Sequence, residues 1–260
     1  MKNHFLRVTT ALVGLPLLVV LVLKAPLWTI FAISALCGGH VFKEWWKMTG
    51  FSPGLFAVGT LSFFLAFGLG SQNLVLAFWV LFLGPVLYFL RRFEKENFLP
   101  QFAPAISGLG YVFLGFFSLA SISTQAQGRL YLLYLLFLVF SSDIGAYYGG
   151  RLFGKHPFFP TISPKKTREG FWSGTFLATL VGFLFSQKWG LFGPREALLV
   201  SFSLSMLAPL GDLLESMVKR ACGVKDSGGI LPGHGGLFDR VDALLFVAPV
   251  FYAYLSGGNP

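Results

Sequence analysis

The sequence predicts an all-α, polytopic integral membrane protein with about nine transmembrane helices. Of its 260 residues, 55% are hydrophobic and only 12% are charged, whereas about 25% of the residues in a soluble domain carry charge. The mean hydropathy is +0.69, and apolar runs near the ~20 residues that cross a bilayer recur along the whole chain. We therefore expect a single membrane domain over residues 1–260.

The apolar runs are considered in chain order. The first follows Lys2 and Arg7 and resembles a signal peptide, but no small-residue cleavage site follows it, so we expect it to be retained as a helix. Only the residues SQN (71–73) separate the third and fourth runs, which predicts a tight helical hairpin. Prolines inside several runs predict kinks of the kind that helix bundles accommodate. The expected spans are 6–23, 26–42, 53–70, 72–90, 102–124, 130–150, 171–188, 196–218 and 241–256.

The distribution of basic residues predicts the orientation. With nine helices, 16 of the 20 Lys and Arg residues fall on the side of the N-terminus, and the other side keeps Lys24, Arg129, Lys188 and Arg195. The positive-inside rule then places the N-terminus in the cytoplasm and the C-terminus outside. The net charge of +9 fits contact with anionic lipid headgroups. Because the sequence has no soluble basic domain, we expect no nucleic-acid partner.

Aspartates are confined to the second half of the chain. Under the predicted topology all of them lie at cytoplasmic helix ends or in cytoplasmic loops, and Asp143 and Asp212 lie at matching depths about 10 Å below the inner surface. An ionised carboxylate within a bilayer costs about 2.5–3.5 kcal/mol, so it usually faces a cavity, a partner or an ion. These acids predict a Mg²⁺ site. The five aspartates are Asp143, Asp212, Asp226, Asp239 and Asp242.

Glu215 allows two interpretations. Asp212, Glu215 and Lys219 share one helix face by their i, i+3, i+7 spacing. Glu215 either pairs with Lys219 four residues on or contributes to the acidic site.

Two predicted cytoplasmic loops offer groups that bind phosphate. SPKKTREG (163–170) supplies Lys165, Lys166 and Arg168 beside hydroxyl groups, and GGILPGHGG (228–236) supplies backbone N–H groups that can surround an anion. Cations beside metal-binding carboxylates are typical of phosphoryl or nucleotidyl transfer. His234 in the second loop either acts as an acid or base or has a positioning role.

The segment SMVKRACGVKDSGGILPGHGGLFDRVD (216–242) resembles the signature of the CDP-diacylglycerol synthase family, also called phosphatidate cytidylyltransferases. SPKKTREG resembles a second stretch of that family, and the likeness is strongest over residues 141–242. The positions that carry the match are Ser216, Lys219, Arg220, Lys225, Asp226, Pro232, His234, Gly235, Gly236, Asp239, Arg240 and Asp242.

The resemblance implies a reaction and a setting for it. CTP and phosphatidate would give CDP-diacylglycerol and pyrophosphate, with Mg²⁺, at the cytoplasmic face of a multi-pass protein of the cell inner membrane that forms a homodimer. Whether a second cation joins the Mg²⁺ is left open. Residues 1–124 would then contact lipid or a second protomer, while residues 125–260 would form the catalytic helices and loops.

Site roles follow from the match. We expect Asp212 and Asp239 as the principal metal ligands, with Asp143 and Asp226 next, and Asp242 either as a ligand or as the partner of Arg240. The expected catalytic residues are Asp212, Asp239, Lys225, Asp226 and Asp143. The expected substrate-binding residues are Lys165, Lys166, Arg168, Ser216, Lys219, Arg220, His234, Gly235, Gly236 and Arg240.

Two other functions compete with this one. A cation-coupled transporter would carry its acids near the bilayer midplane and show repeat symmetry between its halves, and the sequence shows neither. A CTP-dependent polyprenol kinase would share the phosphate chemistry, but its product would be CDP, whereas a cytidylyltransferase releases pyrophosphate.

Overall fold

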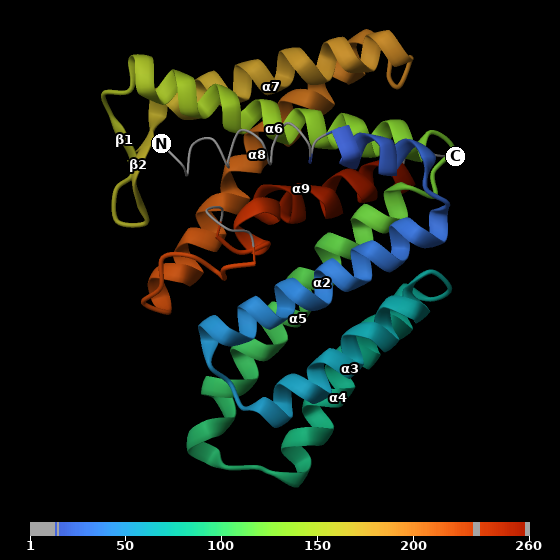
Figure 1. Ribbon diagram of the computed structural model, residues 1–260, viewed down its shortest axis with the longest axis vertical. Coiled ribbons are helices and arrows are strands. Elements are labelled where there is room, and N and C mark those ends of the chain that lie inside the picture. The colour runs from blue at the N-terminus through green and yellow to red at the C-terminus, as the bar shows by residue number, and fades with distance from the viewer. Residues whose placement is uncertain (1–13, 15, 231–234, 258–260) are drawn as a thin grey trace.

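A computed structural model describes residue 14 and residues 16–230 and 235–257. The described chain is helical apart from its connections and one short hairpin (Figure 1). Residues 16–24 are helical. The elements that follow are α2 (Leu27–Thr49), α3 (Pro53–Gly70), α4 (Leu74–Arg91), α5 (Lys95–Ile122), α6 (Gly128–Phe153), β1 (Pro157–Phe159), β2 (Ser163–Thr167), α7 (Arg168–Trp189), α8 (Pro194–Ala221) and α9 (Phe238–Gly257).

Local signals set several helix ends. Helix α2 stops at Gly50, whose φ of 72° is left-handed and whose N–H donates to Trp46 O. The Ser52 side chain accepts from Leu55 N at the start of α3, and Asn73 accepts in the same way from Leu76 N at the start of α4. Residues 71–73 alone join α3 to α4, which confirms the predicted helical hairpin.

The helices confirm an all-α membrane protein. Five of them, α3, α4, α5, α6 and α8, are long and apolar enough to cross a membrane. Most of the large apolar side chains of α4 are exposed, as expected for a helix that contacts lipid. The nine crossings and the orientation of the termini stay predictions, and the first expected span (6–23) lies partly outside the described residues.

Helix α9 joins two hydrophobic cores. One core is built mainly from α2 to α5 and includes Phe238 and Leu245 of α9. The other is built mainly from α6 to α9 and includes Ala243 and Val247. Figure 1 shows α6 and α7 side by side, α8 crossing beneath them, and α9 lying between this group and the α2–α5 pair. The start of α9 is therefore held by both halves of the chain.

The segment expected as a loop at residues 163–170 forms regular structure instead. Strand β2 pairs antiparallel with β1, with Pro157 opposite Thr167 and Phe159 opposite Ser163. At the base of the hairpin, His156 Nδ1 lies 2.6 Å from Glu169 Oε1. The amides of Lys155 and His156 both donate to Glu169 Oε2. These contacts close the hairpin onto the first turn of α7.

Candidate active site

A cavity of about 1030 Å³ opens between α6, the β-hairpin, α8 and the segment that leads into α9. Its wall combines acidic and basic side chains with backbone that lacks side chains, at Gly228, Gly229 and Gly235. The structure thus brings together groups that are far apart in the sequence. The predicted site residues that line the cavity are Asp143, Lys165, Lys166, Asp212, Lys219, Lys225, Asp226, Gly235, Asp239, Arg240 and Asp242.

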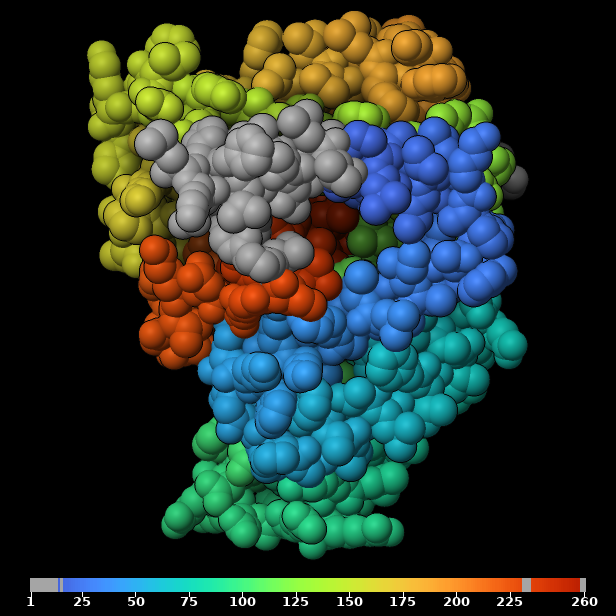
Figure 2. Space-filling model, in the orientation of Figure 1, coloured from blue at the N-terminus to red at the C-terminus, as the bar shows by residue number. Residues whose placement is uncertain are grey.

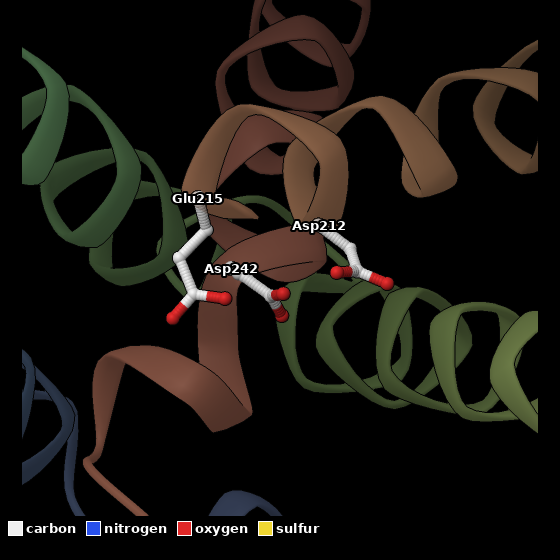
Figure 3. A group of neighbouring side chains, drawn as sticks. All are labelled: Asp212, Glu215 and Asp242. Atoms are coloured by element: carbon white, nitrogen blue, oxygen red, sulfur yellow. The ribbon is translucent and has the colours of Figure 1, made fainter. Parts of the chain in front are cut away.

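Three carboxylates meet at one end of this cavity. Asp212 and Glu215 come from one face of α8 and Asp242 from the first turns of α9, and one oxygen of each lies within 4.8 Å of the others. In Figure 3 the Asp242 side chain lies between those of Glu215 and Asp212. The approach depends on Gly211, because a Cβ there would lie 2.6 Å from Asp242 O. The absence of a side chain at Gly211 thus allows α9 to pack closely against α8 beside Asp212.

The carboxylate cluster fits a hard divalent cation. Glu215 is 1% exposed, and its Oε1 atom has no hydrogen-bond partner within the described part of the chain. Buried polar atoms are almost always partnered, so an unpartnered carboxylate oxygen beside two further carboxylates fits a bound cation. Several carboxylate oxygens together with water and phosphate oxygens make up the ligand set that Mg²⁺ prefers.

The hairpin brings lysines to the cluster. Lys166 Nζ lies 2.5 Å from Asp212 Oδ2, and the neighbouring Lys165 also lines the cavity. The hydrogen bonds from His156 and from the amides of Lys155 and His156 lower the pKa of Glu169 to about 2, which keeps this carboxylate ionised at the base of the hairpin. The charged base therefore helps to hold the two lysines over α8.

Lys219 bridges the carboxylate cluster and Asp239. Its Nζ lies 2.8 Å from Glu215 Oε2 and 2.6 Å from Asp239 Oδ1. Glu215 therefore satisfies both interpretations left open by the sequence, since one oxygen pairs with Lys219 while the residue also joins the cluster. The role of Lys219 as a substrate-binding residue stays a prediction.

Asp239 is engaged by the turn before α9. Its Oδ2 accepts from Ser227 N at 3.0 Å, from Ser227 Oγ at 3.0 Å and from Gly236 N at 2.8 Å. The position of Asp239 is thereby fixed by the backbone on one side and by Lys219 on the other. Metal ligation by Asp239, Asp143 and Asp226, all of which line the cavity, stays a prediction.

Four of the predicted substrate-binding residues lie outside the cavity wall. Ser216 Oγ donates to Asp212 Oδ1 at 3.4 Å, so it contacts the carboxylate cluster without lining the cavity. Arg220 Nε donates to Ile162 O in the hairpin, and Arg168 is exposed at the start of α7. Gly236 packs against Glu44. His234, whose role the sequence left open, lies outside the described residues.

Glu44 is the site-associated residue that the sequence did not single out. It lies on α2, two residues beyond the predicted end of that span, where a charged residue is ordinary. It is nevertheless only 4% exposed, and its two oxygens accept from Leu237 N and Phe238 N at 2.9 and 2.8 Å. Only the contact between α2 and the signature segment, which a single sequence does not reveal, distinguishes it from a surface glutamate.

A family model matches this chain along nearly its whole length, and curated relatives match between 56% and 66% of it. A family model described as "Cytidylyltransferase family" matches residues 5–257. A phosphatidate cytidylyltransferase of Staphylococcus epidermidis is 44% identical over 146 residues, which is 56% of this chain and 55% of that protein. One of Helicobacter pylori is 40% identical over 173 residues, 66% of this chain and 61% of that protein.

A third relative, the phosphatidate cytidylyltransferase of Staphylococcus aureus, is 41% identical over 153 residues, 56% of this chain and 54% of that protein. The matched part of this chain thus spans little more than half the length of these curated relatives. The identity to these phosphatidate cytidylyltransferases agrees with the family resemblance of residues 216–242.

Proposed function

The chain belongs to the cytidylyltransferase family, and we propose on that premise that it transfers the cytidylyl group of CTP to phosphatidate. The products are CDP-diacylglycerol and pyrophosphate. One observation carries the proposal: a single cavity holds the acidic cluster of Asp212, Glu215 and Asp242 together with Lys165 and Lys166. A triphosphate needs carboxylates that hold its cation and lysines that bind its phosphate oxygens.

The phosphate of phosphatidate supplies its own nucleophile. A phosphate monoester has a second pKa near 6 and is largely dianionic at neutral pH, so its oxygen attacks the α-phosphorus of CTP without a dedicated general base. The P–O bond to the pyrophosphate breaks as the new P–O bond forms. Catalysis then rests on positioning and charge stabilisation.

The acidic cluster has a defined part in this scheme. Asp212, Glu215 and Asp242 would hold Mg²⁺, which supplies neutralisation of the negative charge on the triphosphate and its leaving group. Asp143 and Asp226 line the same cavity and add to its negative wall. The contacts of Asp239 with Lys219 and with the turn favour a role in ordering the site.

The basic residues face the phosphates. Lys165, Lys166, Lys225 and Arg240 line the cavity around the acidic cluster, and ammonium and guanidinium groups stabilise charge on the transferring and leaving groups. Lys166 exchanges its contact with Asp212 for a phosphate oxygen when the nucleotide binds. The lysines thus select the triphosphate while the carboxylates hold the cation.

We further propose where the reaction occurs. Phosphatidate stays in the inner leaflet, the cavity faces the cytoplasm from which CTP arrives, and the protein works as a homodimer in the cell inner membrane. The excess of Lys and Arg in the loops on the predicted cytoplasmic side supports this orientation.

The test uses purified full-length protein in detergent with phosphatidate and CTP labelled at either the α- or the γ-phosphate. The expected result is Mg²⁺-dependent transfer of the α-label into lipid, with release of the γ-label as pyrophosphate. Transfer of the γ-label into lipid, with CDP as the other product, would identify a kinase. Cation flux in proteoliposomes without lipid labelling would identify a transporter.

A further inference from the structure

A buried carboxylate outside the cavity contacts the segment that carries part of the site. Glu44 lies on α2, and none of its atoms lines the cavity among the described residues. Its Oε1 accepts from Leu237 N and its Oε2 accepts from Phe238 N, and the Oε2 atom also lies 3.1 Å from Ser227 Oγ. In Figure 2 the orange surface of the segment after α8 meets the light-blue surface of α2. One side chain of the N-terminal half thus binds three groups of the signature segment.

These contacts cap α9 from another helix. The first N–H groups of a helix have no partner within the helix, and a carboxylate beside them is favoured by the helix dipole. Phe238 is the first residue of α9, so Glu44 supplies the cap that the local sequence lacks. Because Asp239 and Asp242 follow within the next turn, the cap fixes where both carboxylates stand.

The chain around Glu44 is shaped to receive it. A Cβ at Gly228 would lie 2.5 Å from Glu44 Oε1, and one at Gly236 would lie 2.7 Å from each Glu44 oxygen. Real Cβ atoms essentially never come this close, so a side chain at either glycine would force the carboxylate or the turn to shift. On its other side, His40 Nε2 lies 3.2 Å from Glu44 Oε1. Both glycines thus leave room for Glu44, and Gly228 also lines the cavity.

Ser227 links Glu44 to the site. Its hydroxyl lies within hydrogen-bond distance of Glu44 Oε2 and, at 3.0 Å, of Asp239 Oδ2. Asp239 in turn holds Lys219, which contacts Glu215 of the carboxylate cluster. A continuous chain of polar contacts therefore runs from α2 to the cluster.

We propose that Glu44 is a positioning residue for the active site, acting through Ser227 and the start of α9 on Asp239 and Asp242. The inference rests on the proposed function for its kinetic consequence, but its structural consequence is independent of activity. A Gln at this position keeps the shape of Glu44 yet offers only one acceptor oxygen, so at least one of the two amides faces an NH₂ group. Misplacement of catalytic groups by about 1 Å can cost about 10²-fold in rate.

The experiment compares Glu44→Gln with Trp46→Phe. Trp46 lies on the same helix and donates through Nε1 to Phe51 O at 2.7 Å, so its variant loses one α2 hydrogen bond away from the signature. In Glu44→Gln, amide hydrogen exchange at Leu237 and Phe238 should accelerate at least about tenfold. Its kcat should fall with a smaller change in KM for CTP, and it should need more Mg²⁺ for half-maximal rate. Trp46→Phe should leave the exchange rates, kcat, KM for CTP and the Mg²⁺ requirement at wild-type values.

Ser227→Ala keeps the test decisive if Glu44→Gln does not fold. This variant removes the link and should change exchange and Mg²⁺ requirement in the same direction by a smaller amount. Wild-type exchange and kcat in Glu44→Gln or in Ser227→Ala would overturn the proposal, as would equal losses in Trp46→Phe. A wild-type protein that makes no CDP-diacylglycerol would defeat the proposed function, whereas the exchange result would still decide the role of Glu44.

Discussion

Lys166 and Asp212 form an ion pair between the β-hairpin and α8, with Nζ and Oδ2 2.5 Å apart. The Lys166 side chain is 25% exposed and that of Asp212 is 38% exposed, so the pair stands at the cavity wall rather than in the protein interior. A cation bound at Asp212 and a phosphate that attracts Lys166 would each compete with this contact. The pair therefore couples the hairpin to whatever occupies the site.

Lys166→Ala should lower kcat/KM for CTP. The variant removes a charge-assisted contact to a phosphate oxygen, and such contacts contribute about 1.5–3 kcal/mol, which corresponds to about ten- to 150-fold. Initial rates at several CTP concentrations measure the change. Lys188→Ala, which removes an exposed lysine at the far end of α7, is the matched control. An unchanged kcat/KM in Lys166→Ala would exclude contact with the nucleotide.

Asp242→Asn should cut kcat by at least about 10²-fold, because it removes one charge from the cluster that would neutralise the triphosphate through Mg²⁺. Treatment of the wild type with EDTA should abolish turnover, and added Mg²⁺ should restore it. Glu96→Gln, an exposed acid in the first turn of α5, should behave as the wild type. Full activity of Asp242→Asn, or of the wild type in EDTA, would contradict a metal site at this cluster.

The acidic residues of the site could be predicted because charged side chains are rare within long apolar helices. Asp143 and Asp212 are charges inside long apolar helices, and such charges need a cavity, a partner or an ion. The structure places both on one cavity wall. The helical spacing of Asp212, Glu215 and Lys219 also predicted that they share a face, and the ion pair between Glu215 and Lys219 follows from it.

Features that depend on contacts between distant segments could not be predicted. Glu44 is an ordinary helix-end glutamate until α2 packs against the turn before α9. The β2 strand contains a proline and two lysines, which favour a loop, and it becomes a strand because His156 and Glu169 close its base. In both cases tertiary partners override the local pattern.

Lys219→Met should destabilise the fold, because Lys219 neutralises two carboxylates at once. Its side chain is 13% exposed and that of Glu215 is 2% exposed. Removing one member of a buried ion pair costs about 3–5 kcal/mol, since the remaining charge is left buried. The midpoint of thermal unfolding in detergent measures the loss. The double variant Lys219→Met/Glu215→Gln should regain part of it, and a double variant no more stable than the single one would argue against this pairing.

Glu169→Gln should weaken CTP binding by loosening the hairpin. Its pKa is lowered from 4.5 to about 2 by the hydrogen bond from His156 and those from backbone amides. A lowered folded-state pKa means that the stabilisation is present above 4.5 and is lost as the pH falls toward 2. Glu169 is therefore ionised throughout the range from about pH 6 to about pH 9. KM for CTP should therefore rise about two- to fivefold in the variant, measured from initial rates at several CTP concentrations. An unchanged KM for CTP in Glu169→Gln would show that the hairpin does not depend on this carboxylate.

Gly236→Ala should lower activity strongly, although alanine is the smallest possible addition. The new Cβ would lie 2.7 Å from both oxygens of Glu44 and would overlap Ser227 Oγ, so the turn and the Glu44 carboxylate must move apart. Because Gly236 N also donates to Asp239 Oδ2, that movement displaces Asp239 and with it Lys219. Steady-state rates should fall by about 10²-fold or more. Gly193→Ala, at a glycine with no atom within 4 Å of the added Cβ, should retain full activity. Equal activity of the two variants would mean that the turn does not depend on the close approach of Glu44.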